Sequence, residues 1–331
     1  MPGSEVLLVL TGRESLKHMY ERIVAQDNIF VQNRKAEREA NSEIRVHKND
    51  FEKQTLDDLR SRMSMENVRA NDLAQMKGAS SWLTALPLKE EGYVLNKREF
   101  FDAVTLRYRW DVKDLPQNCA CSKKFSVEHA MICKKGGYIH RRHDRIRDLF
   151  ADLLSDVSHG VAIEPQLQPL SGEQLPKGSN KDDEARLDLI AKGFWQDFAA
   201  AYFDVRVFYA HARCYLNMNL ESAFKSNEQQ KKTEYNARVV NVEHGSFTPI
   251  VMSSCGGFGI ETTKFVNTLI EKVATKKDMP VSVVANCIRT KVSFELIRSQ
   301  VACMRGSRAW KKMKVDTGEM ELTNVASNIR E

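Results

Sequence analysis

The sequence of 331 residues lacks an apolar run long enough to cross a membrane or to form the core of a signal peptide. Near the N-terminus, residues 6–10 form an apolar run of only five residues, whereas a membrane-spanning helix needs about 20. Glycine-rich phosphate-binding loops of the types G-x-G-x-x-G and G-x-x-x-x-G-K-[ST] are also missing, so the sequence predicts no nucleotide cofactor. We therefore expect an intracellular protein that has no membrane partner.

Proline is absent from residues 14–77, a polar stretch in which charges of both signs are interleaved. Such a composition is typical of solvated helices. Because apolar residues are sparse there, we expect long helices that have little hydrophobic core of their own. We assign residues 1–78 to a charged helical arm.

The seven cysteines are odd in number and unevenly spread, which does not fit the disulfide framework of a secreted protein. Three of them, with one histidine, form the spacing C-x-C-x7-H-x3-C at Cys119, Cys121, His129 and Cys133. This is the ligand set of a small tetrahedral Zn²⁺ site, and zinc would supply folding energy to a segment with few apolar residues. Alternatives stay open: Cys119 does not reach the metal, His140 or His143 replaces a ligand, or these are ordinary reduced cysteines in a loop.

Charge is distributed unevenly along the chain, although the net charge is only +6. Residues 1–100 sum to zero, residues 101–150 to +5, residues 151–200 to −5 and residues 201–331 to +6. Basic blocks on either side of an acidic stretch suit a protein that binds phosphates, whereas a basic block by itself is more often a solvated face. The side chains predicted to contact nucleic acid are Arg141, Arg142, His143, Arg145, Arg305, Arg308, Lys311 and Lys312.

Periodicity predicts an α/β core in the C-terminal part of the chain. Helices are expected at residues 97–110, where Asn96 and Glu99 form a capping pattern, and at 142–155, where apolar residues recur at helical spacing. Strands at 161–168, 186–191 and 201–209 are followed by a helix at 227–239, a strand at 247–253 and helices at 261–275 and 281–304. From residue 142 the order is α-β-β-β-α-β-α-α, which favours a sheet with some antiparallel pairing.

The three consecutive predicted strands carry carboxylates at Glu164, Asp188 and Asp204. A lone buried carboxylate is costly unless it is paired or binds a metal. Carboxylate oxygens are the ligands that Mg²⁺ or Mn²⁺ prefers, and a divalent ion activates water and stabilises charge in phosphodiester hydrolysis. Lys231 and Lys232, on the following predicted helix, are placed to neutralise charge on a scissile phosphate. The alternative is that these are surface carboxylates on edge strands and that the lysines belong to a solvated helix face.

A series of short motifs follows one order along the chain. These motifs are Cys121-x7-His129-x3-Cys133, Gly136-Gly137, Arg142-His143-Asp144, Glu164-Pro165, Arg186-Leu187-Asp188, Asp204, Lys231-x3-Tyr235 and Arg305-Gly306-Ser307. The series resembles the C-terminal region of site-specific non-LTR retrotransposon polyproteins, in which a zinc knuckle precedes a restriction-like endonuclease of the PD-(D/E)xK class. The resemblance covers roughly residues 119–310. The sequence is even more similar to repeat-encoded, mostly uncharacterised animal proteins that share stretches like residues 96–110 and 243–250.

The resemblance implies a PD-(D/E)xK restriction-endonuclease-like core with a small zinc knuckle. It implies that Asp188 and Asp204, with fifteen residues between them, hold Mg²⁺ or Mn²⁺ and that Glu164 helps directly or through water. Lys231 would support the transition state. Residues with secondary roles would be Arg186, Arg206 and Tyr235.

Three departures from the family pattern accompany this resemblance. Leu187 stands in place of a proline that sets backbone shape and ligates nothing. Arg206 occupies the position of the catalytic lysine of other PD-(D/E)xK nucleases, and the retrotransposon family suggests that Lys231 takes over that role. No Tyr-x-Asp-Asp motif occurs, so we expect the reverse transcriptase of the mobile elements to be absent.

Five segments are therefore expected. They are the charged helical arm (1–78), a linker and helix (79–118), the zinc knuckle (119–139), the nuclease-like core (140–260) and C-terminal helices with a basic tail (261–331). The expected function is Mg²⁺-dependent hydrolysis of DNA phosphodiester bonds, in the nucleus where the substrate is chromosomal DNA. Two alternatives stay open: an inactive or domesticated nucleic-acid-binding protein of the same origin, and an interaction protein whose helices at 14–77 self-associate.

Overall fold

The computed structural model describes residues 16–306, and the chain divides into two compact units, residues 1–64 and residues 65–331. In the described part of the first unit, helix α2 (Leu16–Arg62) extends over 47 residues. Ion pairs one turn apart support it, such as Lys48–Glu52 at 3.8 Å and Arg62–Asp58 at 2.7 Å. The expectation of a long polar helix in this region is confirmed.

The second unit begins earlier than the boundary predicted after residue 78. Helix α3 (Met65–Gln75) packs into this unit through Leu73, which is buried in a cluster with Phe208, Phe224 and Val251. Residues 65–78 therefore belong with the globular unit, and the predicted arm is corrected to end at residue 64. The predicted boundaries at 118, 139 and 260 all fall inside this one unit.

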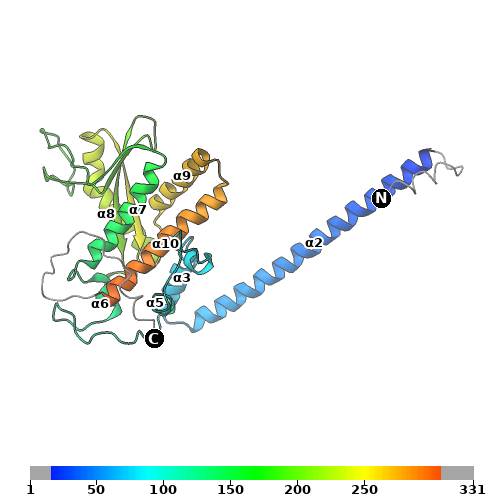
Figure 1. Cartoon of the computed structure of the whole chain (residues 1–331), viewed down its shortest axis with the longest axis horizontal. Coiled ribbons are helices and arrows are strands. Elements are labelled where there is room, and N and C mark those ends of the chain that lie inside the picture. The colour runs from blue at the N-terminus through cyan, green and yellow to red at the C-terminus, as the bar shows by residue number, and fades with distance from the viewer. Residues whose placement is uncertain (1–15, 307–331) are drawn as a thin grey trace. The chain divides into compact units, whose positions relative to one another are not determined.

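Four strands form one mixed sheet in the order β1-β2-β3-β4: β1 (His159–Ile163), β2 (Leu189–Lys192), β3 (Ala200–Phe208) and β4 (Ser246–Ser253). β1–β2 and β2–β3 are antiparallel, whereas β3–β4 is parallel and is connected through helix α8 (Leu220–Asn241). Helix α7 (Tyr138–Ser155) precedes the sheet, and α9 (Ile260–Lys277) and α10 (Val281–Arg305) follow it (Figure 1). The mixed α/β architecture and the order α-β-β-β-α-β-α-α are as predicted.

Alternate residues of β3 face opposite sides of the sheet. Phe203 and Val205 lie in the main core, to which α7, α9 and α10 contribute. Tyr202 lies in a second cluster with Tyr235 of α8. Because side chains alternate along a strand, Asp204 points to the same side as Tyr202, toward α8.

The first two strands are shorter than predicted. β1 ends at Ile163 because Glu164 adopts a left-handed backbone conformation with φ 52°, which does not continue a strand. β2 begins at Leu189, and Arg186 pairs with Gln166 as an isolated β-bridge.

The loop between β1 and β2 is attached to α8 by a buried arginine. Arg238 is fully buried and donates hydrogen bonds to the backbone oxygens of Asn180, Asp182 and Gln168 at 3.3, 2.6 and 3.0 Å. A buried guanidinium is costly when its donors are unpaired; Nη1 and Nη2 of Arg238 are paired, whereas Nε is not. This loop is therefore fixed to the helix that carries Lys231.

The remaining described elements are short. They are α4 (Ser81–Thr84), α5 (Lys97–Tyr108), α6 (Val127–Ile132) and the 3-10 turn Arg213–Tyr215. The predicted capping box of α5 is confirmed, since Asn96 Oδ1 accepts from Glu99 N and Glu99 Oε2 accepts from Asn96 N, both at 2.9 Å. The helix ends at Tyr108 because Arg109 is left-handed, with φ 55°.

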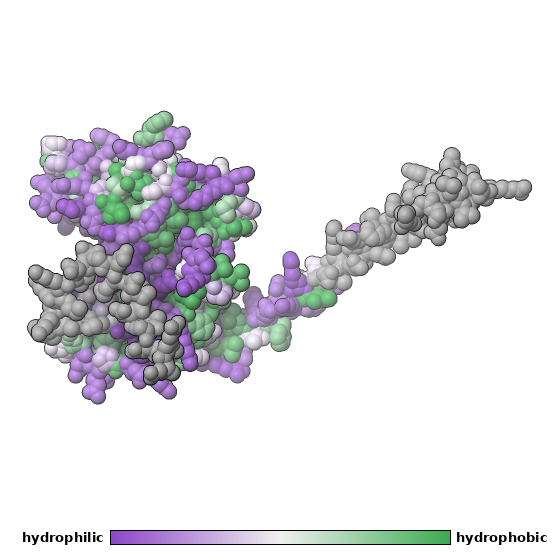
Figure 2. All heavy atoms as spheres, in the orientation of Figure 1, coloured by the Kyte–Doolittle hydropathy of each residue, from purple (hydrophilic) through white to green (hydrophobic). Residues whose placement is uncertain are grey.

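The surface of the second unit is largely polar. Figure 2 shows hydrophilic residues over most of the visible face, with hydrophobic residues gathered in smaller patches. Between residues 16 and 306, no helix combines the length and the apolar character that a membrane-spanning segment requires.

His211 is a buried titratable group that follows β3. Arg109 Nη1 lies 3.1 Å from its Nδ1. Burial, together with the charges of Arg109 and Arg69, lowers the pKa of His211 to about 4. The ring is therefore neutral in the folded protein at neutral pH, and Nδ1 accepts the hydrogen bond from Arg109.

This depressed pKa makes the free energy of unfolding depend on pH. The stabilising contribution of neutral His211 is present above the unfolded-state pKa of about 6.5 and is lost as the pH falls toward 4. Between pH 7.5 and pH 5, we expect the free energy of unfolding of the wild type, measured by urea unfolding, to fall by about 1–2 kcal/mol more than that of His211→Gln. His159→Gln, which changes an exposed histidine, should follow the wild-type curve; coincidence of the His211→Gln and wild-type curves would contradict the assignment.

Candidate functional site

Four potential zinc ligands converge in the segment before α7. The ligand atoms of Cys119, Cys121, His129 and Cys133 all lie within 4.8 Å of one another. The sulfurs of Cys119 and Cys133 are 3.8 Å apart, those of Cys133 and Cys121 are 3.9 Å apart, and Cys121 Sγ is 3.3 Å from His129 Nε2. Zn–S bonds of about 2.3 Å in a tetrahedron place sulfurs about 3.8 Å apart, so this cluster could bind zinc.

Local backbone structure brings these four side chains together. Cys119 N donates to the Lys123 carbonyl oxygen at 2.9 Å, which closes a tight turn around Cys121. His129 lies in α6, and Cys133 follows directly after this helix, one turn later. The turn brings Cys119 into the cluster despite the short C-x-C spacing. His143 lies elsewhere, against a carboxylate.

A second cluster forms where β2 and β3 meet α8. Leu189 pairs with Phe203 in the antiparallel register, so the preceding residue, Asp188, lies opposite Asp204. Asp188 Oδ2 accepts a hydrogen bond from Val205 N at 2.6 Å. The register thus brings together two of the carboxylates that the sequence singled out.

Asp204 is the most buried carboxylate of this cluster. Its side chain is 8% exposed, and Lys231 Nζ lies 2.9 Å from Oδ2. Burial raises the pKa of Asp204 to about 6, and the negative charge of Asp188 contributes, while Lys231 opposes the shift. Oδ2 accepts no hydrogen bond of good geometry from the described residues. The cation that faces this oxygen is the Lys231 ammonium.

His143 of α7 contacts the other aspartate. Its Nε2 lies 3.0 Å from Asp188 Oδ2, and its Nδ1 lies 3.3 Å from Asp144 Oδ1. Burial alone would lower the pKa of His143, but the hydrogen bond and charge of Asp188 raise it to about 9. The ring is therefore an imidazolium at neutral pH, paired with Asp188.

Glu164 forms an ion pair at the end of β1. Arg147 Nη1 of α7 lies 2.6 Å from its Oε1, and the Glu164 side chain is 52% exposed. The backbone of Glu164 is close to Asp188, since its N–H donates to the Asp188 carbonyl oxygen at 2.9 Å. Among the described residues, however, only the cysteine–histidine cluster has three or more ligand atoms this close together. The three carboxylates are thus neighbours that each have a cation of the chain as partner.

The three secondary residues occupy different environments. Tyr235 is buried, and Lys231 Nζ lies 5.4 Å from its ring centroid. Burial, with the nearby charge of Asp204, raises the pKa of the Tyr235 hydroxyl. Arg206 Nη1 donates to Gln230 Oε1 of α8 at 2.7 Å. Arg186 is exposed.

Two predicted nucleic-acid contacts do not fit the structure. Arg142 is 3% exposed and donates to the backbone oxygens of Met131 and Val207, so it joins α6 to β3. Arg305 donates through Nε and Nη2 to Asp102, a carboxylate with no exposed surface. Both guanidinium groups satisfy buried oxygens and are corrected to structural roles.

The other predicted contacts have mixed outcomes. Arg141 is exposed, over the ring of Tyr138 at 5.7 Å. Arg145 Nη1 is 3.4 Å from Glu295 Oε2. Those that lie outside the described residues are Arg308, Lys311 and Lys312.

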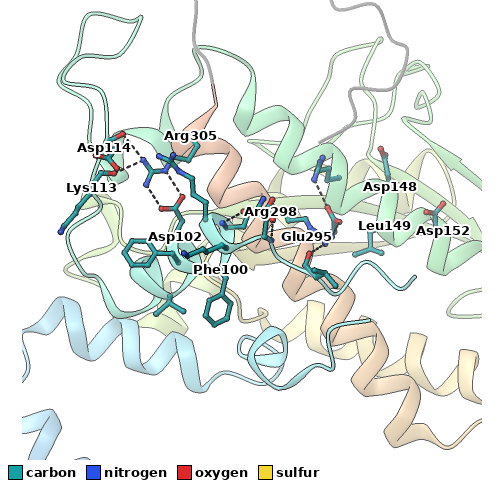
Figure 3. A pocket seen from close by; sticks show the side chains of 18 residues that line it. Phe100, Asp102, Lys113, Asp114, Asp148, Leu149, Asp152, Glu295, Arg298 and Arg305 are labelled. Carbon is teal, nitrogen blue, oxygen red and sulfur yellow. Dashed lines mark hydrogen bonds and ion pairs between the residues drawn. The ribbon is translucent and has the colours of Figure 1, made fainter. Parts of the chain in front are cut away.

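A cavity of about 1440 Å³ opens beside α5, α7 and α10 (Figure 3). Its lining contains six basic and six acidic residues, and Arg298, Arg145 and Arg305 each form an ion pair with an acid of the same wall. A wall with equal numbers of basic and acidic residues does not favour the binding of a polyanion such as nucleic acid. The cavity is therefore not assigned as a nucleic-acid site.

Sequence reasoning missed the roles of His143 and Arg147. These residues are four positions apart on α7, so they project from one face of the helix, and each pairs with a carboxylate next to a strand end. Their i, i+4 spacing beside the apolar stripe of this helix was the available signal. Its meaning required knowledge of which strand ends lie opposite that face.

Among known proteins, no protein-family model and no curated protein matches this chain.

The cysteine–histidine cluster gives a prediction for zinc. Purified protein should hold one Zn²⁺ per chain by elemental analysis, and chelation should lower the melting temperature because the metal binds the folded state. Cys133→Ala removes a buried ligand and should lose the zinc, whereas Cys214→Ala, at an exposed cysteine outside the cluster, should keep it. Equimolar zinc in Cys133→Ala would contradict the assignment.

Proposed function

We propose that this protein is a metal-dependent endonuclease with a PD-(D/E)xK restriction-endonuclease-like core and a zinc knuckle. The observation that supports it is the position of Asp188, directly before β2, opposite Asp204 of β3, with Lys231 of the next helix 2.9 Å from Asp204. The resemblance of the sequence to retrotransposon nucleases implies the same three residues. Neither the fold pattern nor the charge composition alone would select this chemistry.

The two aspartates fit a Mg²⁺ or Mn²⁺ ion. Such ions are often bound by one or two carboxylates and retain several waters, and Asp204 Oδ2 is a buried carboxylate oxygen whose cationic neighbour is the Lys231 ammonium, 2.9 Å away. Asp188 and Asp204 would hold the ion, and Glu164 would help directly or through water. When bound, the metal would supply a polarised water and charge stabilisation at the phosphate.

The residues around the proposed ion would supply positive charge to the phosphates of the substrate. Lys231 is 19% exposed, and its ammonium would turn from Asp204 to the scissile phosphate, where it stabilises developing negative charge. The ring of Tyr235 lies beside this lysine, with its centroid 5.4 Å from Nζ. Arg186 and Arg206 lie near the aspartates in sequence and offer cations for the flanking phosphates.

One observation favours a second candidate, a non-catalytic nucleic-acid-binding protein of the same origin. Asp188 is paired with His143, Asp204 with Lys231 and Glu164 with Arg147. Three such pairs compensate the carboxylates without any metal. In that case the cluster is a stabilising ion-pair network, and DNA or RNA binding would survive loss of Asp204.

Cleavage of supercoiled DNA separates the two functions. The wild type should nick plasmid DNA with Mg²⁺ or Mn²⁺, and Asp188→Ala and Asp204→Ala should each reduce the rate by at least about 100-fold, because each removes a metal ligand. Asp197→Ala, at an exposed aspartate between β2 and β3, is the matched control and should cleave at the wild-type rate.

A readout other than activity accompanies this test. Mn²⁺ titration followed by electron paramagnetic resonance should show one bound ion in the wild type and in Asp197→Ala, and none at the same concentration in Asp188→Ala. Equal nicking by all variants would overturn the proposed nuclease activity. So would a folded wild type that neither nicks DNA nor binds Mn²⁺. The second outcome, with salt-sensitive DNA binding retained, would support the non-catalytic protein.

A further inference from the structure

Helix α2 exposes apolar side chains without a core to cover them. Ile44 is 65% exposed, Phe51 69%, Val46 54% and Leu59 48%. Figure 2 shows hydrophobic residues set among hydrophilic ones on the described part of this helix. Helical stability in proteins comes mainly from packing of an apolar face. A partner that covers part of its surface would therefore stabilise a helix of 47 residues.

In the sequence of α2, apolar residues recur with a period of seven, and the exposed Ile44 and Phe51 belong to this series. The residues with this spacing, with Glu37 as one interruption, are Leu16, Ile23, Phe30, Ile44 and Phe51. A seven-residue apolar repeat is the period of helices that supercoil around each other, and these positions are the a positions of the heptad. The residues three places later in the second half of α2, which occupy the d positions, are the polar residues His47, Gln54 and Ser61. We call these a and d positions the seam.

The charges that flank the seam suit a second copy of α2. In a parallel, in-register pair, each g residue faces the e residue five positions later on the other helix. Glu43 then faces Lys48 of the second copy, and Asp57 faces Arg62. Asp50 faces the neutral Thr55. Within residues 42–62, each pairing of this kind is thus attractive or neutral.

The polar residue at the end of the seam is also compensated. Asp58 occupies an a position, and its Oδ1 accepts a hydrogen bond from Arg62 Nη2 of the same helix at 2.9 Å. A polar a residue lowers the stability of a coiled coil and fixes its register. In this alignment Asp58 faces Asp58 of the second copy, and the Arg62 of each helix offsets the repulsion between the two carboxylates.

We propose that α2 is a dimerisation element, in which two copies of this chain form a parallel, in-register coiled coil along the seam. The pair would extend about 70 Å at 1.5 Å per residue. Ile44 and Phe51 become buried between the copies, whereas Val46 and Leu59 remain on the outside. This inference is independent of the nuclease, because it rests on a different unit of the chain.

Matched substitutions inside and outside the seam test this dimer. By sedimentation equilibrium at micromolar concentration, the full chain should have twice its mass of 37.8 kDa. The double variant Ile44→Asp/Phe51→Asp should be monomeric because it places four charges in the seam of the pair. Val46→Asp/Leu59→Asp adds the same charges to comparably exposed positions outside the seam and should stay dimeric. A monomeric wild type, or equal effects of the two double variants, would overturn the proposal.

A charge reversal tests the parallel alignment. Glu43→Lys sets two like-charged pairs across the dimer, so the dissociation constant should rise about fivefold in low salt. Adding Lys48→Glu to the same chain restores opposite charges and should recover most of the wild-type affinity. If the double variant binds no more tightly than Glu43→Lys alone, the copies do not align in this register. Circular dichroism of each variant separates loss of pairing from loss of the globular unit.

Discussion

Burial of the Asp204 carboxylate is the constraint around which the candidate site is organised. The residue lies inside β3, which is hydrogen-bonded to β2 on one side and to β4 on the other. Its backbone is therefore fixed, and its side chain is directed to the α8 face. A carboxylate with 8% exposure needs a compensating charge. Lys231 provides this charge. Because α8 carries Lys231 and connects β3 to β4 along the chain, the position of this helix determines both the stability of the cluster and the chemistry that the cluster can support.

The same compensation extends to the neighbouring carboxylates. His143 and Arg147 of α7 pair with Asp188 and Glu164, so α7 and α8 deliver cations to the carboxylate in β3 and to those beside the ends of β1 and β2. A divalent ion at the aspartates would have to exchange with these ion pairs, because like the cations it neutralises carboxylate charge. The two candidate functions thus differ in one physical quantity, the affinity of the aspartates for a metal relative to their affinity for Lys231 and His143.

Local patterns predicted the features that depend on neighbouring residues in the sequence. The capping box at Asn96, the order of helices and strands after residue 142 and the four residues of the cysteine–histidine cluster are all found in the structure. Features that depend on distant residues were not predictable in this way. Arg305 was expected on DNA, but it is bound to Asp102, and no periodicity links these two positions. Arg142 was misassigned for the same reason, because its partners lie in α6 and β3.

The backbone also limited the sequence-based description of the strands. Glu164 reads as the continuation of an apolar run, yet its positive φ ends β1 there. A charged residue rarely adopts this conformation unless its surroundings fix it, and here Arg147 and the Asp188 backbone do so. The pairing of Asp188 with Asp204, by contrast, followed from strand order once the register was known.

The most direct test of the proposed metal site is the anomalous scattering of crystals soaked with Mn²⁺. The endonuclease requires one anomalous peak within about 2.5 Å of carboxylate oxygens of both Asp188 and Asp204, with Lys231 moved away from Asp204. The absence of a peak at saturating Mn²⁺ would contradict the proposed metal site, if the ion pairs Asp188–His143 and Asp204–Lys231 both remain intact in the same crystals.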